Sequence, residues 1–287
     1  MWTVSSELSQ YDALLLLSFG GPDGPDDVLP FLKRVVQGRN VPEARLAEVA
    51  ERYMQFGGKS PINELNEALI QALRVVLEKD GPHLPIYYGN RNWHPLLEDT
   101  LRRMRGDGIK HALAFVTSAY SSYSGCRQYL ENIETARAAL GEDAPMVTKI
   151  RPYFNHPYFI KAVVESARAS LAAIQQQANG ATVAYAFTAH SIPQAMSAKC
   201  DYLEQLNCVA SLVAHELGID SWKLIFQSRS GPPHLPWLEP DVNDYLRPLR
   251  KRASRMPGFV LLASFRIILK SFMIWILKLS KTQKLLE

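Results

Sequence analysis

Short apolar runs alternate with amphipathic segments along most of this chain. Uninterrupted runs such as residues 11–19 and 182–188 are typical of strands that are buried on both faces of a parallel sheet. The pattern predicts strands over residues 11–19, 85–89, 112–118, 146–150, 182–188 and 222–228. Apolar residues at three- and four-residue spacing predict helices over 28–36, 45–56, 61–77, 95–105, 124–140, 157–177 and 201–217. This alternation predicts an α/β fold with parallel sheets flanked by helices.

The alternation restarts near Gly141, which suggests two similar halves. We expect an N-terminal half over residues 1–145, a C-terminal half over 146–250, and a tail of different character over 251–287. In α/β folds of this kind, ligands bind beyond the carboxyl ends of the strands. Residues that directly follow the predicted strands are therefore the candidates for chemistry.

His190 is the first such candidate, because it follows the predicted strand 182–188 within the stretch TAHSIP. Neutral imidazole binds divalent metals and exchanges protons near neutral pH, although a single histidine can equally be structural. Ser60 precedes Pro61 and is predicted to cap the helix that follows, where it could also donate to an anionic ligand. Arg52 can bind a carboxylate through two hydrogen bonds or remain solvated.

Three loops have unusual composition. Phe19 is followed by two glycines, which allow close approach of a ligand or simply a tight turn. Residues 117–129 hold three tyrosines and four serines after a strand, a composition suited either to an aromatic wall for a flat ligand or to an ordinary loop. Residues 226–238 are rich in proline and glycine and contain Trp237 as a predicted aromatic anchor.

Composition narrows the function classes. The formal net charge of +4 is mild and the basic residues are scattered, so we expect no nucleic-acid partner. The three cysteines (Cys126, Cys200 and Cys208) match neither a disulfide framework nor a C-x-x-C metal site, and the N-terminus does not resemble a signal peptide. These features predict a cytoplasmic protein.

Five stretches taken together resemble the ferrochelatase family, most closely the bacterial, actinobacterial-like branch that metallates coproporphyrin III. They occur in the family's order within residues 11–249 and read LLLLSFGGP, RYMQFGGKSPINELN, SAYSSYSGCRQY, TAHSIP and FQSRSGPPHLPWLEPDV. The resemblance implies two Rossmann-like, chelatase-type halves with a porphyrin cleft between them. It also implies a lyase of haem and porphyrin biosynthesis that inserts ferrous iron into coproporphyrin III or protoporphyrin IX.

The resemblance also assigns residues. It implies that His190 binds the ferrous ion and helps to remove pyrrole protons, that Ser60 and Tyr129 contact the porphyrin, and that Arg52 contacts its propionates. Phe19 stands where some relatives carry a tyrosine facing the metal, and a phenyl ring cannot ligate. Cys126 matches one cysteine of a [2Fe–2S] cluster found in some relatives, but the other ligands have no counterpart here, so no cluster is expected.

Two further readings stay open: a cobalt chelatase of the same fold, and a non-catalytic porphyrin- or haem-binding protein. A third possibility is a membrane tether, because residues 258–279 are long and apolar enough to cross a bilayer. However, Arg266 and Lys270 lie near the middle of this segment, where each costs roughly 2.5–3.5 kcal/mol on insertion scales. We therefore do not expect a transmembrane anchor.

The tail departs from the family, whose motif G-F-V-S-D-H-x-E-V-L-Y-D supplies a glutamate across the metal from His190. The printed tail contains no glutamate before Glu287. Phe265, Arg266 and Ile267 can nevertheless be encoded by TTT-CGG-ATC, which in the shifted frame reads Ser-Asp and the start of His. Permitted codons on either side recover the motif. We infer a one-base slip between about Arg250 and Pro257.

The inferred slip predicts the result of re-reading the coding DNA between the codons for Arg250 and Leu279. We expect one base to be missing or extra, and its correction to restore the glutamate motif. A confirmed reading frame would contradict the hypothesis, and the chain would then lack its second metal-site residue.

Overall fold

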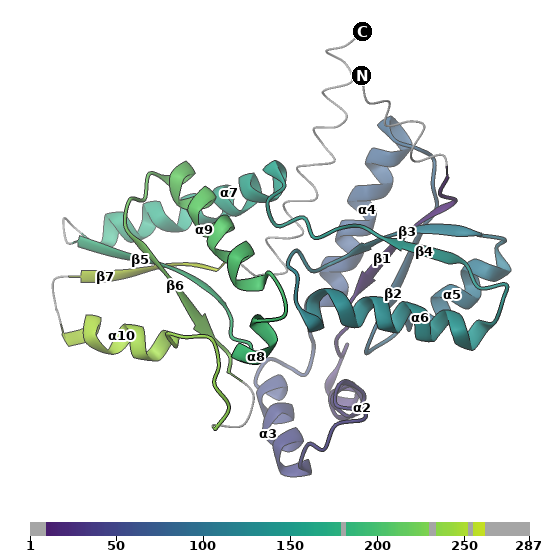
Figure 1. Cartoon of the computed structure of the whole chain (residues 1–287), viewed down its shortest axis with the longest axis horizontal. Helices are drawn as coiled ribbons and strands as arrows, with labels where there is room; N and C mark the ends of the chain where they lie inside the picture. Colours follow the sequence, from purple (N-terminus) through teal and green to yellow (C-terminus); the bar gives the residue numbers. More distant parts are fainter. Residues whose placement is uncertain (1–9, 179–181, 230–233, 252–254, 262–287) are drawn as a thin grey trace, which may run out of the picture. The chain divides into compact units, whose positions relative to one another are not determined.

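A computed structural model describes residues 10–178, 182–229, 234–251 and 255–261 of the chain. These residues form two compact α/β units (Figure 1). The first unit holds residues 10–117 and Gln128–Arg151, and the second holds Ser118–Arg127 and residues 152–261. The predicted tail 251–287, including most of the apolar segment 258–279, lies largely outside the described residues.

The first unit contains a four-stranded parallel sheet in the order β2-β1-β3-β4. The strands are β1 (Ala13–Ser18), β2 (Ile86–Asn90), β3 (His111–Val116) and β4 (Met146–Lys149). The helices are α2 (Pro25–Val35), α3 (Glu43–Met54), α4 (Ile62–Asp80), α5 (Leu97–Gly106) and α6 (Gln128–Leu140). The predicted strands and helices of this half are confirmed, with shifts of a few residues at their ends.

The core of this unit follows from the alternation of side chains along the strands. Leu15 and Leu17 of β1 pack on one face of the sheet with Leu101 of α5 and Ile133 of α6, and all four are almost completely buried. Leu16 points to the opposite face, which α4 covers (Figure 1). Covering both faces explains why the strands are uninterrupted apolar runs.

The second unit contains a three-stranded parallel sheet in the order β6-β5-β7. The strands are β5 (Thr182–His190), β6 (Trp222–Gln227) and β7 (Arg255–Leu261). The helices are α7 (Pro157–Ala178), α8 (Gln194–Ser197), α9 (Tyr202–Leu217) and α10 (Val242–Lys251), with α7 and α9 packed together on one face (Figure 1). The predicted C-terminal half ended at residue 250, whereas β7 adds residues 255–261 to its sheet.

Three local predictions need correction. Pro30 lies inside α2 rather than in its first turn, because the helix already begins at Pro25. The helix predicted over residues 124–140 starts with a π-helical turn, Tyr123–Arg127, before α6. The strand before the TAHSIP stretch extends to His190 instead of ending at Thr188, since pairing with β6 continues to Gln227.

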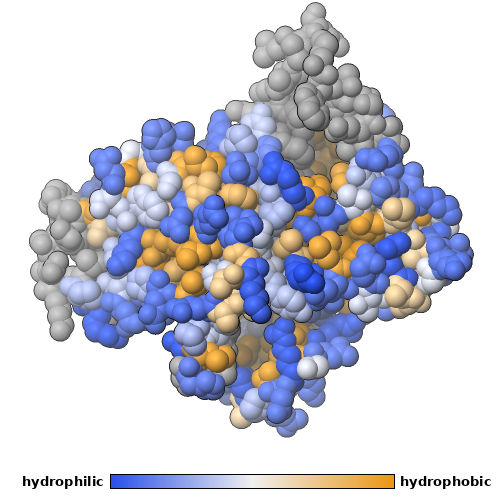
Figure 2. All heavy atoms as spheres, in the orientation of Figure 1, coloured by the Kyte–Doolittle hydropathy of each residue, from blue (hydrophilic) through white to orange (hydrophobic). Residues whose placement is uncertain are grey.

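Polar and apolar side chains are mixed on the surface of the described residues. On the face in Figure 2, hydrophilic side chains surround separate apolar groups. The most exposed large apolar side chains include Phe56, at 81%, and Val75, at 65%. Among the described helices, none combines the length and the apolar character that a membrane span requires.

The carboxylate of Asp12 generates a pH-dependent prediction for this fold. Its Oδ2 atom accepts hydrogen bonds from the backbone N–H groups of His111 and Lys110, both at 2.9 Å, and these bonds hold the pKa of Asp12 below its usual value. Such a group stabilises the fold above its unfolded-state pKa of about 3.9, and the contribution is lost as pH falls through the lower folded-state pKa.

We therefore expect Asp12→Asn to lower the free energy of unfolding by less than about 1 kcal/mol at pH 7, because the group is exposed to solvent. The difference from the unsubstituted protein should fade towards pH 3. Urea unfolding at several pH values measures this, and a deficit that does not change with pH would show that the charge is unimportant.

Candidate functional site

The carboxyl ends of β1 and β2 are held side by side in the first unit. Ser18 is in register with Asn90, and the pairing continues beyond the strands. The N–H of Arg91 donates to the Ser18 carbonyl at 3.0 Å, and the N–H of Asn92 donates to the Phe19 carbonyl at 3.1 Å. Parallel pairing therefore brings Phe19 and Arg91 to the same edge of the sheet.

Arg91 links two of the predicted site residues. Its guanidinium carbon lies 5.7 Å from the ring centroid of Phe19 and 4.6 Å from that of Tyr129. Its Nε donates to Oδ1 of Asn132 at 2.7 Å, which orients the side chain. Cation–π contacts of this kind contribute roughly 0.5–1 kcal/mol each, and more when desolvated. Our sequence analysis missed Arg91, although it directly follows a predicted strand, as Phe19 does.

Tyr129 is only 3% exposed, near the start of α6. Burial raises the pKa of its phenol to about 12, against the opposing effect of Arg91. The hydroxyl therefore stays protonated at neutral pH and remains a hydrogen-bond donor. Its contact with a porphyrin stays a prediction.

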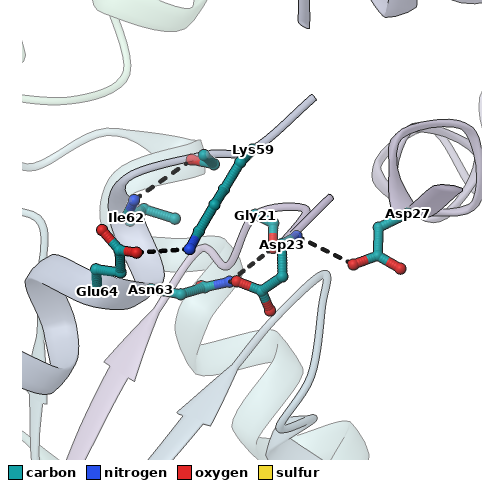
Figure 3. A network of polar contacts seen from close by, with 8 residues as sticks. Gly21, Asp23, Asp27, Lys59, Ile62, Asn63 and Glu64 are labelled. Carbon is teal, nitrogen blue, oxygen red and sulfur yellow. Dashed lines mark hydrogen bonds and ion pairs between the residues drawn. The ribbon is translucent and has the colours of Figure 1, made fainter. Parts of the chain in front are cut away.

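Ser60 lies against the glycine loop that follows β1. Its N–H donates to the Pro22 carbonyl at 2.8 Å, and its Oγ accepts from the N–H of Ile62 at 3.4 Å (Figure 3). The predicted cap is wrong by one residue: Pro61 occupies the N-cap position and α4 begins at Ile62. Ser60 instead forms a serine turn just before the helix, which leaves it beside the loop.

A buried asparagine fixes this loop in place. Asn63, 6% exposed, donates through Nδ2 to the Gly21 carbonyl at 2.8 Å and to Oδ1 of Asp23 at 2.9 Å (Figure 3). Lys59 pairs with Glu64 at 2.5 Å on the outside of the same turn. The start of α4 and the loop after β1 are thus one polar assembly, which our sequence analysis did not predict.

Arg52 stands on α3 with 62% of its side chain exposed and pairs with Glu48 at 2.6 Å. Glu48 also pairs with Arg45, and the hydrogen bond from Arg45 is the main cause of the lowered pKa of the Glu48 carboxyl. Exposed ion pairs of this kind are weak, so a carboxylate ligand can compete for Arg52. The propionate contact stays a prediction.

His190 is the last residue of β5, at the carboxyl edge of the second unit's sheet. Its carbonyl accepts a hydrogen bond from the Tyr202 hydroxyl at 3.1 Å, and the N–H of Ser191 donates to the Gln227 carbonyl at 2.8 Å. His190 is exposed, yet partial desolvation of the ring lowers the pKa of its imidazole below the usual value. The neutral form that binds metals therefore predominates at pH 7.

The tyrosine-rich loop does not form the single aromatic wall that we predicted. Tyr120 is buried in the second unit, where its ring packs edge-on against Phe159 at 6.2 Å and Tyr202 at 6.0 Å. Tyr123, in the π-helical turn, is 40% exposed, whereas Tyr129 is buried in the first unit. The burial of two of the three rings explains the error, because composition alone does not distinguish core aromatics from ligand-facing ones.

The loop after β6 is tied to the loop after β5. Pro193 and Trp237 form an antiparallel bridge, and Ser191 Oγ donates to the Leu238 carbonyl at 2.9 Å. Trp237 is 6% exposed, which confirms it as the predicted aromatic anchor. Residues 230–233 of this loop lie outside the described residues.

Metal-binding side chains are sparse in the described part of the chain. No group of three or more histidine, cysteine, aspartate or glutamate residues gathers there in a way that could hold a metal ion. Cys126 is half-buried in the π-helical turn. His190 is thus the sole predicted metal-binding residue within the described ranges.

Comparison with known proteins gives a consistent result. A family model described as Ferrochelatase matches residues 11–262, which extends the resemblance beyond the Leu249 limit that we expected. A protein named ferrochelatase from Rhodopirellula baltica is 56% identical over 239 residues, covering 83% of this chain and 68% of that protein.

Two further relatives are named coproporphyrin III ferrochelatase. The protein from Mycobacteroides abscessus is 48% identical over 248 residues, covering 85% of this chain and 72% of the relative. The protein from Streptomyces coelicolor is 47% identical over 274 residues, covering 89% and 72% respectively. Among solved structures, the sirohydrochlorin chelatase SirB from Bacillus subtilis, in complex with cobalt, is 11% identical with a TM-score of 0.44, covering 95% of this chain and 96% of SirB.

Gly21 provides a steric test of the loop next to Ser60. A Cβ atom at this position would lie 2.6 Å from Ser60 Cβ and 2.8 Å from Ile62 Cγ2. We expect Gly21→Ala to lower the free energy of unfolding by about 1–3 kcal/mol, because the loop must move away from α4.

Gly106→Ala is the matched control, because a Cβ there would meet no atom within 4 Å. This change should leave stability unchanged or raise it by roughly 1 kcal/mol, since the residue ends a helix. Equal effects of the two substitutions in chemical denaturation would rule out the close packing of Gly21 on Ser60.

Proposed function

This chain belongs to the ferrochelatase family, and we propose that it inserts ferrous iron into coproporphyrin III, or protoporphyrin IX, in haem biosynthesis. The observation that carries the proposal is the placement of His190 at the carboxyl end of β5, with an imidazole whose pKa lies below the usual value. The names of the relatives support the substrate and the metal.

In the proposed reaction, the porphyrin loses two pyrrole protons as the metal enters, and no electron is transferred. His190 binds the incoming ferrous ion through a neutral ring nitrogen and accepts a proton from a pyrrole N–H. Iron and porphyrin are both substrates. We propose no [2Fe–2S] cluster, because Cys126 alone matches the cluster ligands.

The porphyrin is contacted by residues of the first unit. Ser60, beside the glycine loop, donates to the macrocycle or its substituents, and Tyr129 is held by Arg91 as a protonated donor. Arg52 exchanges its exposed partner Glu48 for a propionate. Phe19 packs against the porphyrin and supplies no axial ligand.

The chain as printed is proposed to be slow. Its sequence after Glu239 contains no carboxylate-bearing glutamate before Glu287, so the acidic partner of His190 is missing. Without this partner the second proton has no acceptor and the cation is less well balanced. We further propose that the protein acts in the cytoplasm without a membrane anchor.

Anaerobic metallation of coproporphyrin III, followed by absorbance and fluorescence, tests the function. We expect a shift of the Soret band when the porphyrin binds and then a time-dependent conversion to the metalloporphyrin. His190→Ala should reduce the metallation rate by roughly 100-fold or more, because it removes both a ligand and a proton acceptor, and should leave porphyrin binding unchanged.

His215→Ala is the control, since this exposed histidine lies in the last turn of α9. A Soret shift without any metallation would favour the non-catalytic porphyrin-binding protein. Metallation that survives in His190→Ala would exclude the proposed role of His190. A preference for cobalt over iron would favour the cobalt chelatase.

A further inference from the structure

The backbone of His190 ends where the sheet ladder ends. Its pairing with Gln227 is the last of the β5–β6 register, so the next carbonyl group needs a partner from elsewhere. The Tyr202 hydroxyl supplies it, donating to the His190 carbonyl at 3.1 Å. This side-chain bond takes the place of a strand–strand bond at the residue that carries the imidazole.

Tyr202 is itself held rigidly. It is the first residue of α9 and only 6% exposed. Its ring packs edge-on against Tyr120, which packs in the same way against Phe159. Contacts between rings in this geometry add about 0.5–1.5 kcal/mol beyond the area that they bury. The hydroxyl therefore has little freedom to leave the His190 carbonyl.

A second contact of α9 holds the segment that supplies Tyr120. Gln205, one turn after Tyr202 and 6% exposed, accepts from the N–H of Ser121 at 2.7 Å and donates to Ser121 Oγ at 2.8 Å. The first turn of α9 thus joins the end of β5 to the segment Ser118–Arg127. Both partners of the amide are satisfied, as buried polar groups require.

We propose that Tyr202 is a positioning residue for metal insertion: its hydroxyl fixes the backbone of His190 and so sets the direction from which the imidazole approaches the metal. The pair Gln205–Ser121 keeps Tyr202 in place through Tyr120. This inference rests on the proposed role of His190. Tyr202 touches neither substrate, so it acts only through His190.

The substitution Tyr202→Phe tests this directly, because it keeps the ring and removes one hydrogen-bond donor. Zinc insertion into coproporphyrin III, read by fluorescence, is sensitive enough for a slow enzyme. We expect the rate at saturating porphyrin to fall by about 3- to 30-fold, since small misplacement of a reacting group costs up to about 100-fold. The KM for porphyrin should change by less than about twofold, because the residues assigned to porphyrin lie elsewhere.

An NMR signal of the His190 imidazole gives a readout that does not depend on activity. It is identified by its absence from His190→Ala and should shift or broaden in Tyr202→Phe. Tyr185→Phe is the matched control on the same strand, where the hydroxyl accepts only an exposed bond from Gln175 at 3.3 Å. The control should change neither the rate nor the signal.

The outcomes separate this inference from the proposed function. If His190→Ala abolishes metallation while Tyr202→Phe keeps the full rate and an unchanged imidazole signal, the positioning role is wrong and the function stands. If Tyr202→Phe changes the KM for porphyrin and the melting temperature as much as the rate, its role is merely structural and the proposal is overturned. If His190→Ala metallates normally, both fall together.

Discussion

Parallel pairing of the strands is the constraint on which the site depends. In the first unit, the register of Ser18 with Asn90 brings Phe19 and Arg91 to one edge. In the second unit, the register of β5 with β6 places His190 at the corresponding edge of its own sheet. Strands buried on both faces cannot slip by one residue without exposing apolar side chains, so these positions are fixed by the core.

Hydrogen bonds from buried side chains extend that order beyond the ends of the strands. Asn63 holds the loop after β1, and Tyr202 and Gln205 hold the end of β5 and the segment that packs on α9. Each of these groups is almost completely buried, so removing its partner leaves an unsatisfied polar atom that costs about 1–3 kcal/mol. Such positions tolerate few substitutions and hold the candidate site residues in defined places.

The sequence predicted the strands and His190 because both depend on local patterns. Uninterrupted apolar runs identified β1, β3 and β5, and polar residues after them identified Phe19 and His190 as candidates. The contacts of Arg91, Asn63 and Gln205 join residues tens of positions apart, which no periodic pattern reveals. The tyrosine-rich loop shows the same limit: the ring of Tyr120 is buried because α9 lies beside it, a property of the fold and not of the loop's composition.

The central claim is that the described residues bind the porphyrin and present His190, whereas rapid metallation also needs the acidic partner that the printed tail lacks. The direct test compares the 287-residue chain with one in which the reading frame of the tail is restored. We predict that both shift the Soret band of coproporphyrin III with similar affinity, and that only the restored chain metallates it rapidly. Equal metallation rates, or no porphyrin binding by either chain, would contradict the account.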